Sequence, residues 1–257
     1  MSRIISFIYG LVAYAIFFAT FLYAIGFVGN LVVPKTINSG TPVPFWLALL
    51  VNAGLLGLFA IQHSVMARIG FKKLWSKIVP HSIERSTYVL LASLLLALMF
   101  WQWRPMPSLI WDIQQPVAAL VLSVLFWAGW GTVLVTTFMI NHFDLFGLRQ
   151  VYLHLRGKPY IPLEFKMAGF YNYVRHPLLM GFMIAFWATP RMTAGHLLFA
   201  IATTAYMLIA IQFEEKDLVK FHGEAYVNYR SKVSMIFPFK KKSAQPQKKA
   251  VEQKEVI

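Results

Sequence analysis

The stretch GFYNYVRHPLLMG, from Gly169 to Gly181, decides how the C-terminal part of this chain folds. Pro177 begins a long apolar run, and proline favours the first position of a helix because its missing N–H costs nothing there. Arg175 and His176 therefore precede a helix, at its positively polarised end. Free N–H groups at that end attract an anion, and a guanidinium fork suits a carboxylate. The stretch predicts a site for a ligand that carries a carboxylate.

A second polar stretch, EEKDLVKFHGEAYVNYR from Glu214 to Arg230, follows the last apolar run. It places Glu214 and Glu215 near the C-terminal end of a helix, where the helix dipole disfavours carboxylates. A pair of carboxylates in that position indicates a positively charged partner. Together the two polar stretches are typical of a cofactor site.

The composition predicts a polytopic membrane protein. Hydrophobic residues make up 58% of the 257 residues and charged residues only 13%, whereas soluble domains carry about a quarter charged residues. The apolar runs cover residues 4–29, 45–67, 87–103, 117–140, 177–190 and 194–213. The fifth run reaches only about 21 Å at about 1.5 Å per residue, less than a hydrocarbon core of about 30 Å. We predict an all-α bundle of about six membrane segments, whose short fifth segment forms a hairpin with the sixth.

Positive charge is unevenly distributed along the chain, which has a formal net charge of +14. Of the 24 Lys and Arg residues, only Lys35, Arg104 and Arg191 fall in the loops on one side of a six-segment topology. The positive-inside rule then places both termini and both polar stretches in the cytoplasm. Anionic lipid headgroups explain most of the remaining charge, so membrane lipids are expected partners and nucleic acid is not.

Several kinds of chemistry are excluded by the residues that the sequence lacks. There is no cysteine, which rules out iron–sulfur clusters, thiolate metal sites and cysteine nucleophiles. The chain also has no HExxH, Walker or GxGxxG motif. Its seven histidines do not form the cluster typical of membrane di-iron enzymes. We therefore predict no metal.

The chain divides into a membrane domain and a tail. We predict one integral-membrane domain at residues 1–238, with the cofactor-binding part at about 141–238. Residues 239–257 are rich in Lys and Gln and lack aromatic residues, a composition typical of a disordered basic tail.

The two polar stretches resemble those of the integral-membrane methyltransferases of the isoprenylcysteine carboxyl methyltransferase and phospholipid methyltransferase type. The shared patterns are G-x-Y-x-x-x-R-H-P-x-x-x-G and E-E-x-x-L-x-x-x-x-G-x-x-Y-x-x-Y. In that family both elements wrap S-adenosylmethionine, although membrane sterol reductases share the architecture and bind a nicotinamide cofactor. The resemblance implies cofactor contacts by Tyr171, Arg175, His176, Pro177, Glu214, Glu215, Tyr226 and Tyr229. It implies that Arg175 binds the methionyl carboxylate and that Glu214 or Glu215 binds the amino group or the ribose hydroxyls.

The N-terminal half narrows this resemblance. The QHS sequence at residues 62–64 and the Glu84–Arg85 pair are similar to the NnrU-like branch of the family. Residues 141–160 resemble bacterial membrane-bound members that methylate methanethiol to dimethyl sulfide. The resemblance implies that activity, a small thiol as partner, and a multi-pass protein of the bacterial inner membrane. Two other interpretations stay open: a lipid or prenylated acceptor, and a non-catalytic NnrU-like factor in nitrogen-oxide or haem biology.

Methyl transfer to a thiol also calls for a base. The thiolate is the reactive form, and simple thiols ionise at or above about pH 8.5. His142 and Asp144 lie at the inner end of the fourth apolar run, and His63 lies at the inner end of the second. Each of the three is a candidate for the residue that takes the proton.

Overall fold

The computed structural model describes residues 2–163 and 168–238. Five helices in this part of the chain are long and apolar enough to cross a membrane. They are α1 (Arg3–Gly29), α2 (Phe45–Ala67), α4 (His81–Gln102), α5 (Pro116–Ile140) and α9 (Ala194–His222). The predicted polytopic helical bundle is thereby confirmed. The predicted tail, residues 239–257, lies outside the described residues.

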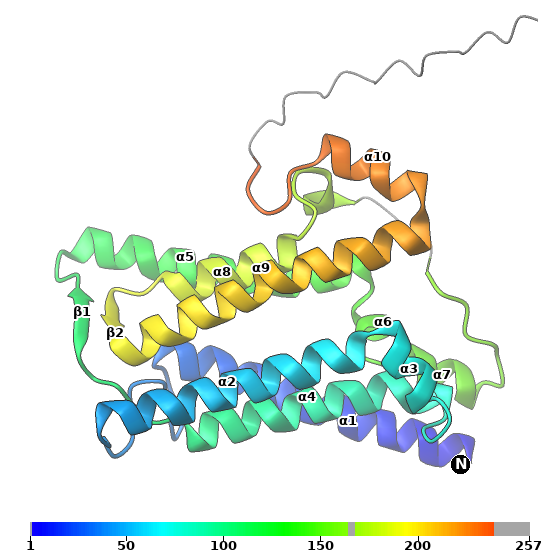
Figure 1. Ribbon diagram of the computed structural model, residues 1–257, viewed down its shortest axis with the longest axis horizontal. Coiled ribbons are helices and arrows are strands. Elements are labelled where there is room, and N and C mark those ends of the chain that lie inside the picture. The colour runs from blue at the N-terminus through cyan, green and yellow to red at the C-terminus, as the bar shows by residue number, and fades with distance from the viewer. Residues whose placement is uncertain (1, 164–167, 239–257) are drawn as a thin grey trace, which may run out of the picture.

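The fifth apolar run forms the short helix α8 (Pro177–Trp187), which has 11 residues. Pro177 occupies its first turn, as the sequence predicts. A short strand, β2 (Arg191–Thr193), joins α8 to α9 and pairs antiparallel with β1 (Leu109–Asp112). The two strands connect the ends of the helices on one side of the bundle, where α8 and α9 form the predicted hairpin (Figure 1).

Two of the long helices extend beyond the apolar runs that predicted them. Helix α4 begins at His81 rather than near residue 87, and α9 continues to His222 rather than ending near residue 213. Hydropathy marks only the part of a helix that can lie in lipid, whereas a helix can continue with polar residues beyond it. The added turns carry Glu84, Arg85 and Glu214, so they bear on the site.

The short helices gather at the end of the bundle opposite the strands (Figure 1). They are α3 (Ile69–Trp75), α6 (His142–Leu145), α7 (Leu148–Leu155), a 3-10 turn (Gly169–Asn172) and α10 (Glu224–Lys232). The N-terminus lies at the same end. Most of the basic residues of the described chain are therefore collected there, while Lys35, Arg104 and Arg191 lie near the strands.

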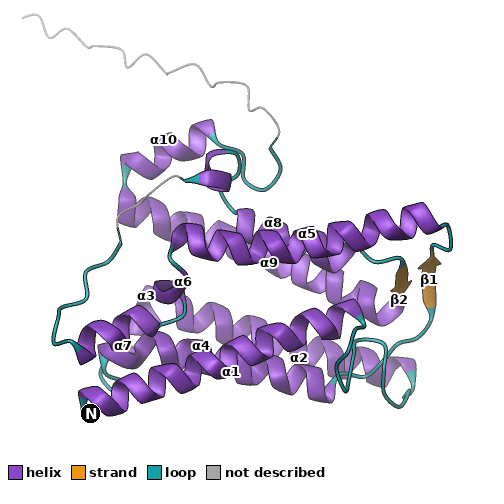
Figure 2. Ribbon diagram, turned by 180° about the vertical axis from the view of Figure 1, so that it is seen from behind, coloured by secondary structure: helices purple, strands orange, loops and turns teal. Residues whose placement is uncertain are grey.

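The long helices form two layers (Figures 1 and 2). Helices α1, α2 and α4 make one layer, and α5, α8 and α9 make the other. Within the second layer α5 and α8 touch through their backbones. A Cβ atom on Gly129 would lie 2.7 Å from the carbonyl oxygen of Gly181, and one on Gly181 would lie 2.8 Å from that of Gly129. Small residues permit this approach between membrane helices, so α8 is held tightly on α5.

An aromatic cluster joins the two layers near the strands. The rings of Phe27 and Phe100 are 4.7 Å apart, and the Trp103 ring lies 5.9 Å from Phe199 on α9. The Trp103 side chain is fully buried and donates its indole N–H to the carbonyl of Ile37 at 3.1 Å. At the other end, the layers are joined by polar contacts between α2 and α9. Arg68 bonds Asp217 at 3.0 Å.

Candidate active site

A large cavity lies between the two layers. Its volume is about 1440 Å³, and every long helix contributes to its wall. The deeper part is apolar and aromatic, with Phe21, Phe59, Phe182, Phe186 and Phe199 among the lining residues. The charged lining residues come from the end of the bundle where the short helices gather: Arg85, Asp144, Arg149, Arg175 and Glu214. All the predicted site residues line this cavity except Pro177 and Glu215, so the fold brings residues from three distant parts of the sequence to one place.

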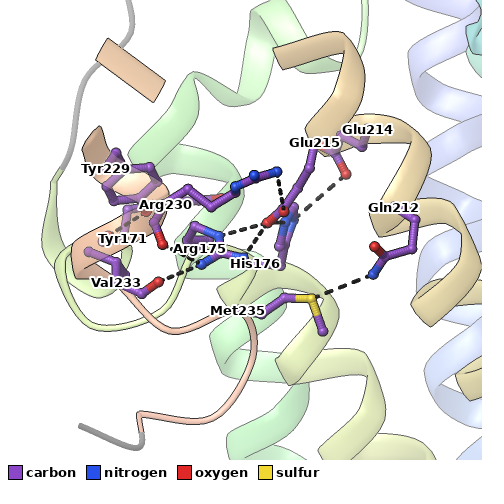
Figure 3. A network of polar contacts seen from close by, with 10 residues as sticks. All are labelled: Tyr171, Arg175, His176, Gln212, Glu214, Glu215, Tyr229, Arg230, Val233 and Met235. Atoms are coloured by element: carbon purple, nitrogen blue, oxygen red, sulfur yellow. Dashed lines mark hydrogen bonds and ion pairs between the residues drawn. The ribbon is translucent and has the colours of Figure 1, made fainter. Parts of the chain in front are cut away.

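The guanidinium of Arg175 forms hydrogen bonds with a glutamate side chain and with backbone carbonyls of this chain (Figure 3). Its Nε and Nη2 atoms each lie 2.6 Å from Oε1 of Glu215. Its Nη1 atom donates to two backbone carbonyls, those of Arg230 at 3.1 Å and Val233 at 2.5 Å. The side chains of Arg175 and Glu215 are only 5% and 8% exposed. The positively charged partner that the sequence predicts for Glu215 is therefore Arg175, and the two form a buried ion pair between α8 and α9.

The segment after α10 closes over the start of α8. The backbone N–H of Arg175 donates to the carbonyl of Ser234 at 2.8 Å, and that of His176 donates to Met235 at 3.0 Å. The hydroxyl of Tyr229 donates to the carbonyl of Tyr171 at 2.6 Å. These bonds use N–H groups next to the α8 N-terminus that the sequence predicts to attract an anion.

The two adjacent glutamates differ in their surroundings. Oε1 of Glu215 lies 3.2 Å from Nε2 of His176, inside the buried network. Oε2 of Glu214 lies 3.7 Å from Nδ1 of the same histidine, but the Glu214 side chain is 53% exposed and lines the cavity. Glu214 thus presents a carboxylate to the cavity, whereas the carboxylate of Glu215 bonds Arg175 and His176 within the wall.

The tyrosines of the polar stretches remain protonated. Burial raises the pKa of Tyr171 and of Tyr226 well above the usual value of about 10, and it raises the pKa of Tyr229 to about 12. All three line the cavity. Their hydroxyl groups therefore keep their protons at neutral pH.

The sequence of this chain is similar to those of several named proteins. The chain is 58% identical over 239 residues to methanethiol S-methyltransferase of Mycobacterium tuberculosis, an alignment that covers 93% of this chain and 98% of the relative. The chain belongs to the methanethiol S-methyltransferase family. The same-named protein of Crocosphaera subtropica is 53% identical, with 93% and 94% covered, and that of Pseudomonas sp. is 48% identical, with 92% and 91% covered.

More distant comparisons are consistent with this assignment. Nurim of Sus scrofa is 30% identical over 178 residues, which cover 65% of this chain and 66% of that protein. No family model and no solved structure matches the chain. The resemblance to membrane methyltransferases that the sequence predicts is confirmed by the named relatives.

In this methanethiol S-methyltransferase family member, His142 has both ring nitrogens engaged. Nδ1 lies 2.8 Å from Oγ1 of Thr137, and Nε2 lies 2.8 Å from the hydroxyl of Tyr14. Because Thr137 donates its own proton to the carbonyl of Leu134 at 2.7 Å, Nδ1 donates to Thr137 and Nε2 accepts from Tyr14. Burial lowers the pKa of His142 below its ordinary value, which keeps the ring neutral.

The carboxylate of Asp144 is also engaged by neighbours. Its Oδ1 lies 2.8 Å from Nη1 of Arg149, and its Oδ2 accepts from the hydroxyl of Tyr160 at 3.3 Å. Asp144 lines the cavity but its charge is paired there.

The ring of His63 contacts one tyrosine hydroxyl among residues 2–163 and 168–238. Both of its ring nitrogens lie 2.9 Å from the hydroxyl of Tyr88 on α4. The imidazole stacks on Phe59 with ring centres 5.2 Å apart. His63, Tyr88 and Arg85 line the cavity together, in the wall that faces α8 and α9.

Sequence reasoning did not assign a role to Arg85 or Tyr88. Arg85 contributes only to the resemblance with the NnrU-like branch, through the Glu84–Arg85 pair. Nothing in the sequence distinguishes Tyr88 from a tyrosine that anchors a helix at the membrane interface. The helical spacing of three residues between them, which puts them on one face, is the signal that relates them once α4 is known to begin at His81.

Within residues 2–163 and 168–238, no group of His, Asp and Glu is arranged to hold a metal ion.

Proposed function

We propose that this protein transfers a methyl group from S-adenosylmethionine to the sulfur of methanethiol and releases dimethyl sulfide. One observation carries the proposal: a single cavity is lined both by the family's two polar stretches and by the candidate bases of the N-terminal half. The relatives named methanethiol S-methyltransferase, with more than nine-tenths of this chain aligned to several of them, support the choice of acceptor.

The wall of the cavity that is formed by lining residues between Tyr171 and Tyr229, here called the C-terminal wall, fits the proposed cofactor. S-adenosylmethionine, when bound, supplies an electrophilic methyl group on a sulfonium cation. The carboxylate of Glu214, which reaches the cavity, is suited to its amino group. Tyr171 offers a hydroxyl donor, and Tyr171 and Tyr226 offer ring faces, which attract a cation by about 1 kcal/mol. The cavity is also large enough for a cofactor and an acceptor together.

The buried ion pair defines what Arg175 can do. Since Nε, Nη1 and one N–H of Nη2 are used by Glu215 and two carbonyls, one N–H of Nη2 remains for the methionyl carboxylate. We propose that His176 and Pro177 fix the direction of this arginine, because His176 bonds Glu215 and Pro177 begins α8. Glu215 then orients Arg175 and contacts the cofactor only through it.

The arrangement favours His63 as the residue that takes the thiol proton. His142 has both nitrogens engaged and Asp144 is paired with Arg149. His63 bonds only the hydroxyl of Tyr88 through its ring in the described chain. A tyrosine hydroxyl can accept a proton from the thiol as it gives its own to the imidazole, so Tyr88 connects the acceptor to His63. His142 and Asp144 remain the alternatives.

We propose that the enzyme lies in the bacterial inner membrane with its active site facing the cytoplasm. The basic residues gather at the end of the bundle where the charged lining of the cavity lies, and three basic residues lie at the other end. The positive-inside rule supports this orientation. We further propose that residues 1–238 act as one domain and that the cofactor contacts come from residues 141–238.

The proposal is tested by product formation. Purified protein in detergent is incubated with S-adenosylmethionine and methanethiol, and dimethyl sulfide in the headspace is measured by gas chromatography. We expect product that depends on both substrates and falls strongly in Glu214→Gln. The matched control is Glu224→Gln, which removes the same charge from an exposed position at the start of α10. No product from a protein that binds S-adenosylmethionine would contradict the acceptor, and no binding would favour a non-catalytic factor.

The size of the cavity favours a second candidate acceptor, one with a longer apolar chain such as a lipid. About 1440 Å³ exceeds what one cofactor and methanethiol fill, and the excess is lined by phenylalanines. The same assay with a long-chain alkanethiol or a phospholipid in place of methanethiol tests this candidate. Higher turnover with the longer acceptor would favour it.

A further inference from the structure

Three arginines line the cavity, and they differ in how their charge is balanced. Arg149 bonds Asp144 at 2.8 Å, and Arg175 bonds Glu215 at 2.6 Å. Arg85 has no carboxylate within ion-pair distance among residues 2–163 and 168–238. Its Nε donates to the carbonyl of Leu145 at 2.7 Å, and its guanidinium carbon lies 5.1 Å from the centre of the Tyr88 ring. The two terminal nitrogens of Arg85 are therefore available to a ligand.

An arginine in such a place indicates an anion. Removing a guanidinium from water costs free energy unless an opposite charge or hydrogen bonds compensate for it. Arg85 is only partly exposed; it bonds the carbonyl of Leu145, which precedes Phe146, and it packs on Tyr88, whose partner His63 stacks on Phe59. A small anion with an apolar group fits these neighbours better than a large hydrated one. We infer that Arg85 binds the sulfur of the acceptor as its thiolate, an inference that rests on the proposed methyltransferase activity.

The position of Arg85 favours the acceptor over the cofactor carboxylate. Arg85, Tyr88 and His63 lie on α4 and α2, in one layer, whereas Arg175 and Glu214 lie on the other layer beside α8 and on α9 (Figures 1 and 3). Displacement at a methyl carbon requires the nucleophile and the leaving group on opposite sides of it. With the cofactor held by the C-terminal wall, the nucleophile comes from the wall that carries Arg85.

Contacts between the layers keep these two walls in register. The hydroxyl of Ser64, next to His63, donates to the hydroxyl of Tyr206 on α9 at 3.2 Å. Tyr206 also lines the cavity, and its ring centre lies 6.5 Å from that of His63. The Arg85 side of the cavity is thus tied to the helix that carries Glu214.

The chemistry balances without a further reactant. The thiol gives its proton to His63 through Tyr88, and from there the proton passes to water. The thiolate sulfur forms a bond to the methyl carbon as the carbon–sulfonium bond breaks, and that electron pair stays on the departing sulfur. One negative and one positive charge disappear, so two neutral thioethers leave. Arg85 holds the thiolate charge before transfer and neither gains nor loses a proton.

The test compares Arg85→Gln and Arg85→Lys with the wild type. Methyl transfer to methanethiol is measured from pH 6 to 10, and S-adenosylmethionine affinity is measured separately by calorimetric titration. We expect Arg85→Gln to keep its cofactor Kd within about twofold and to lose about 100- to 1000-fold in kcat/KM for methanethiol, the range found when one charge-stabilising donor is removed. Its acidic limb should move toward the pKa of a free thiol, at or above about 8.5. Arg85→Lys, which keeps the charge, should recover much of the loss.

The control and the contrary results separate this inference from the proposed function. Lys73→Gln removes one positive charge from an exposed position on the nearby α3, and Lys73 does not line the cavity, so this variant should leave all values unchanged. An Arg85→Gln protein with unchanged kcat/KM and pH profile would overturn the inference while the enzyme remains active. Loss of cofactor affinity in Arg85→Gln would also overturn it and assign Arg85 to the carboxylate. A wild type that makes no dimethyl sulfide would instead contradict the proposed function.

Discussion

The two walls of the cavity handle charge in opposite ways. The C-terminal wall balances Arg175 internally, with Glu215, His176 and two backbone carbonyls around it. In the wall formed by α2 and α4, here called the N-terminal wall, Arg85 donates one hydrogen bond to a carbonyl and packs on one ring, with no carboxylate of the described chain within ion-pair distance. The paired guanidinium of Arg175 stabilises the fold of its wall. The guanidinium of Arg85, which has no carboxylate partner in the described chain, is suited to bind an anionic ligand. We propose that the wall with the internally paired arginine binds the cofactor and that the wall with Arg85 binds the acceptor.

The largest effect is expected from breaking the buried pair in the C-terminal wall. Arg175→Met leaves the carboxylate of Glu215 buried without its partner, so we expect a loss of about 3–5 kcal/mol in the free energy of unfolding. The double variant Arg175→Met/Glu215→Met should recover a large part of this loss. Denaturant unfolding of the purified protein in detergent, arranged as a double-mutant cycle, measures both.

The half-exposed ion pair between the layers, Arg68 with Asp217, is the control for that cycle. Arg68 and Asp217 have side chains 34% and 32% exposed, and removing such a pair costs at most about 1 kcal/mol. A cycle that gives equal coupling for the two pairs would contradict the structural role of Arg175.

A somewhat smaller effect is expected where α5 meets α8. A Cβ on Gly129 would lie 2.6 Å from the backbone nitrogen of Ala185, so Gly129→Ala must push α8 away from α5. We expect about 1–3 kcal/mol of destabilisation and weaker cofactor binding, because α8 carries the Arg175 loop. Gly131→Ala on the same helix is the matched control, since a Cβ there meets nothing within 4 Å. Equal thermal stability of the two variants would show that the helices do not touch in this way.

The N-terminal wall should tolerate added bulk without loss of stability. Gly57 lines the cavity and a Cβ there meets nothing within 4 Å. We expect Gly57→Phe to fill the deeper part and to lower kcat/KM for hexanethiol severalfold relative to methanethiol. Gly54→Phe, at an exposed position of the same helix outside the cavity, should not change this ratio. An unchanged ratio in both variants would mean that acceptors do not enter this part of the cavity.

The smallest effect concerns pH. Burial lowers the pKa of His142 in the folded protein, so the unfolded chain takes up a proton first as the pH falls. The stability that the neutral ring contributes is complete above the unfolded pKa of about 6.5 and is lost as the pH falls from there through the folded pKa. His142→Gln should therefore show a shallower fall in melting temperature between pH 7 and pH 5. Parallel melting curves for variant and wild type would contradict this.

The sequence predicts the helical segments well because each membrane helix is a continuous apolar run. Helices α4 and α9 each extend past their apolar runs, because polar turns outside the apolar part leave no hydropathy signal. The short α8 and its hairpin are foreseen from Pro177 and from the length of the run. Local signals of this kind are contained within a few turns of chain.

The contacts between site residues cannot be predicted from the sequence in the way that the helices can. Arg175 and Glu215 are both predicted as ligand-binding residues, yet they bind each other across 40 positions of sequence. Neither residue type nor spacing reports that contact, which depends on how α8 packs on α9. Arg85 is the converse case: Glu84 precedes it in the sequence, yet no carboxylate of the described chain lies within ion-pair distance of it, and only the packed helices show this.

A structure of the protein with S-adenosylhomocysteine tests the assignment of the two walls most directly. The assignment predicts the amino acid end of the ligand beside Glu214 and Arg175, with its sulfur directed across the cavity toward Arg85 and Tyr88. A ligand whose carboxylate binds Arg85, with the C-terminal wall vacant, would contradict it.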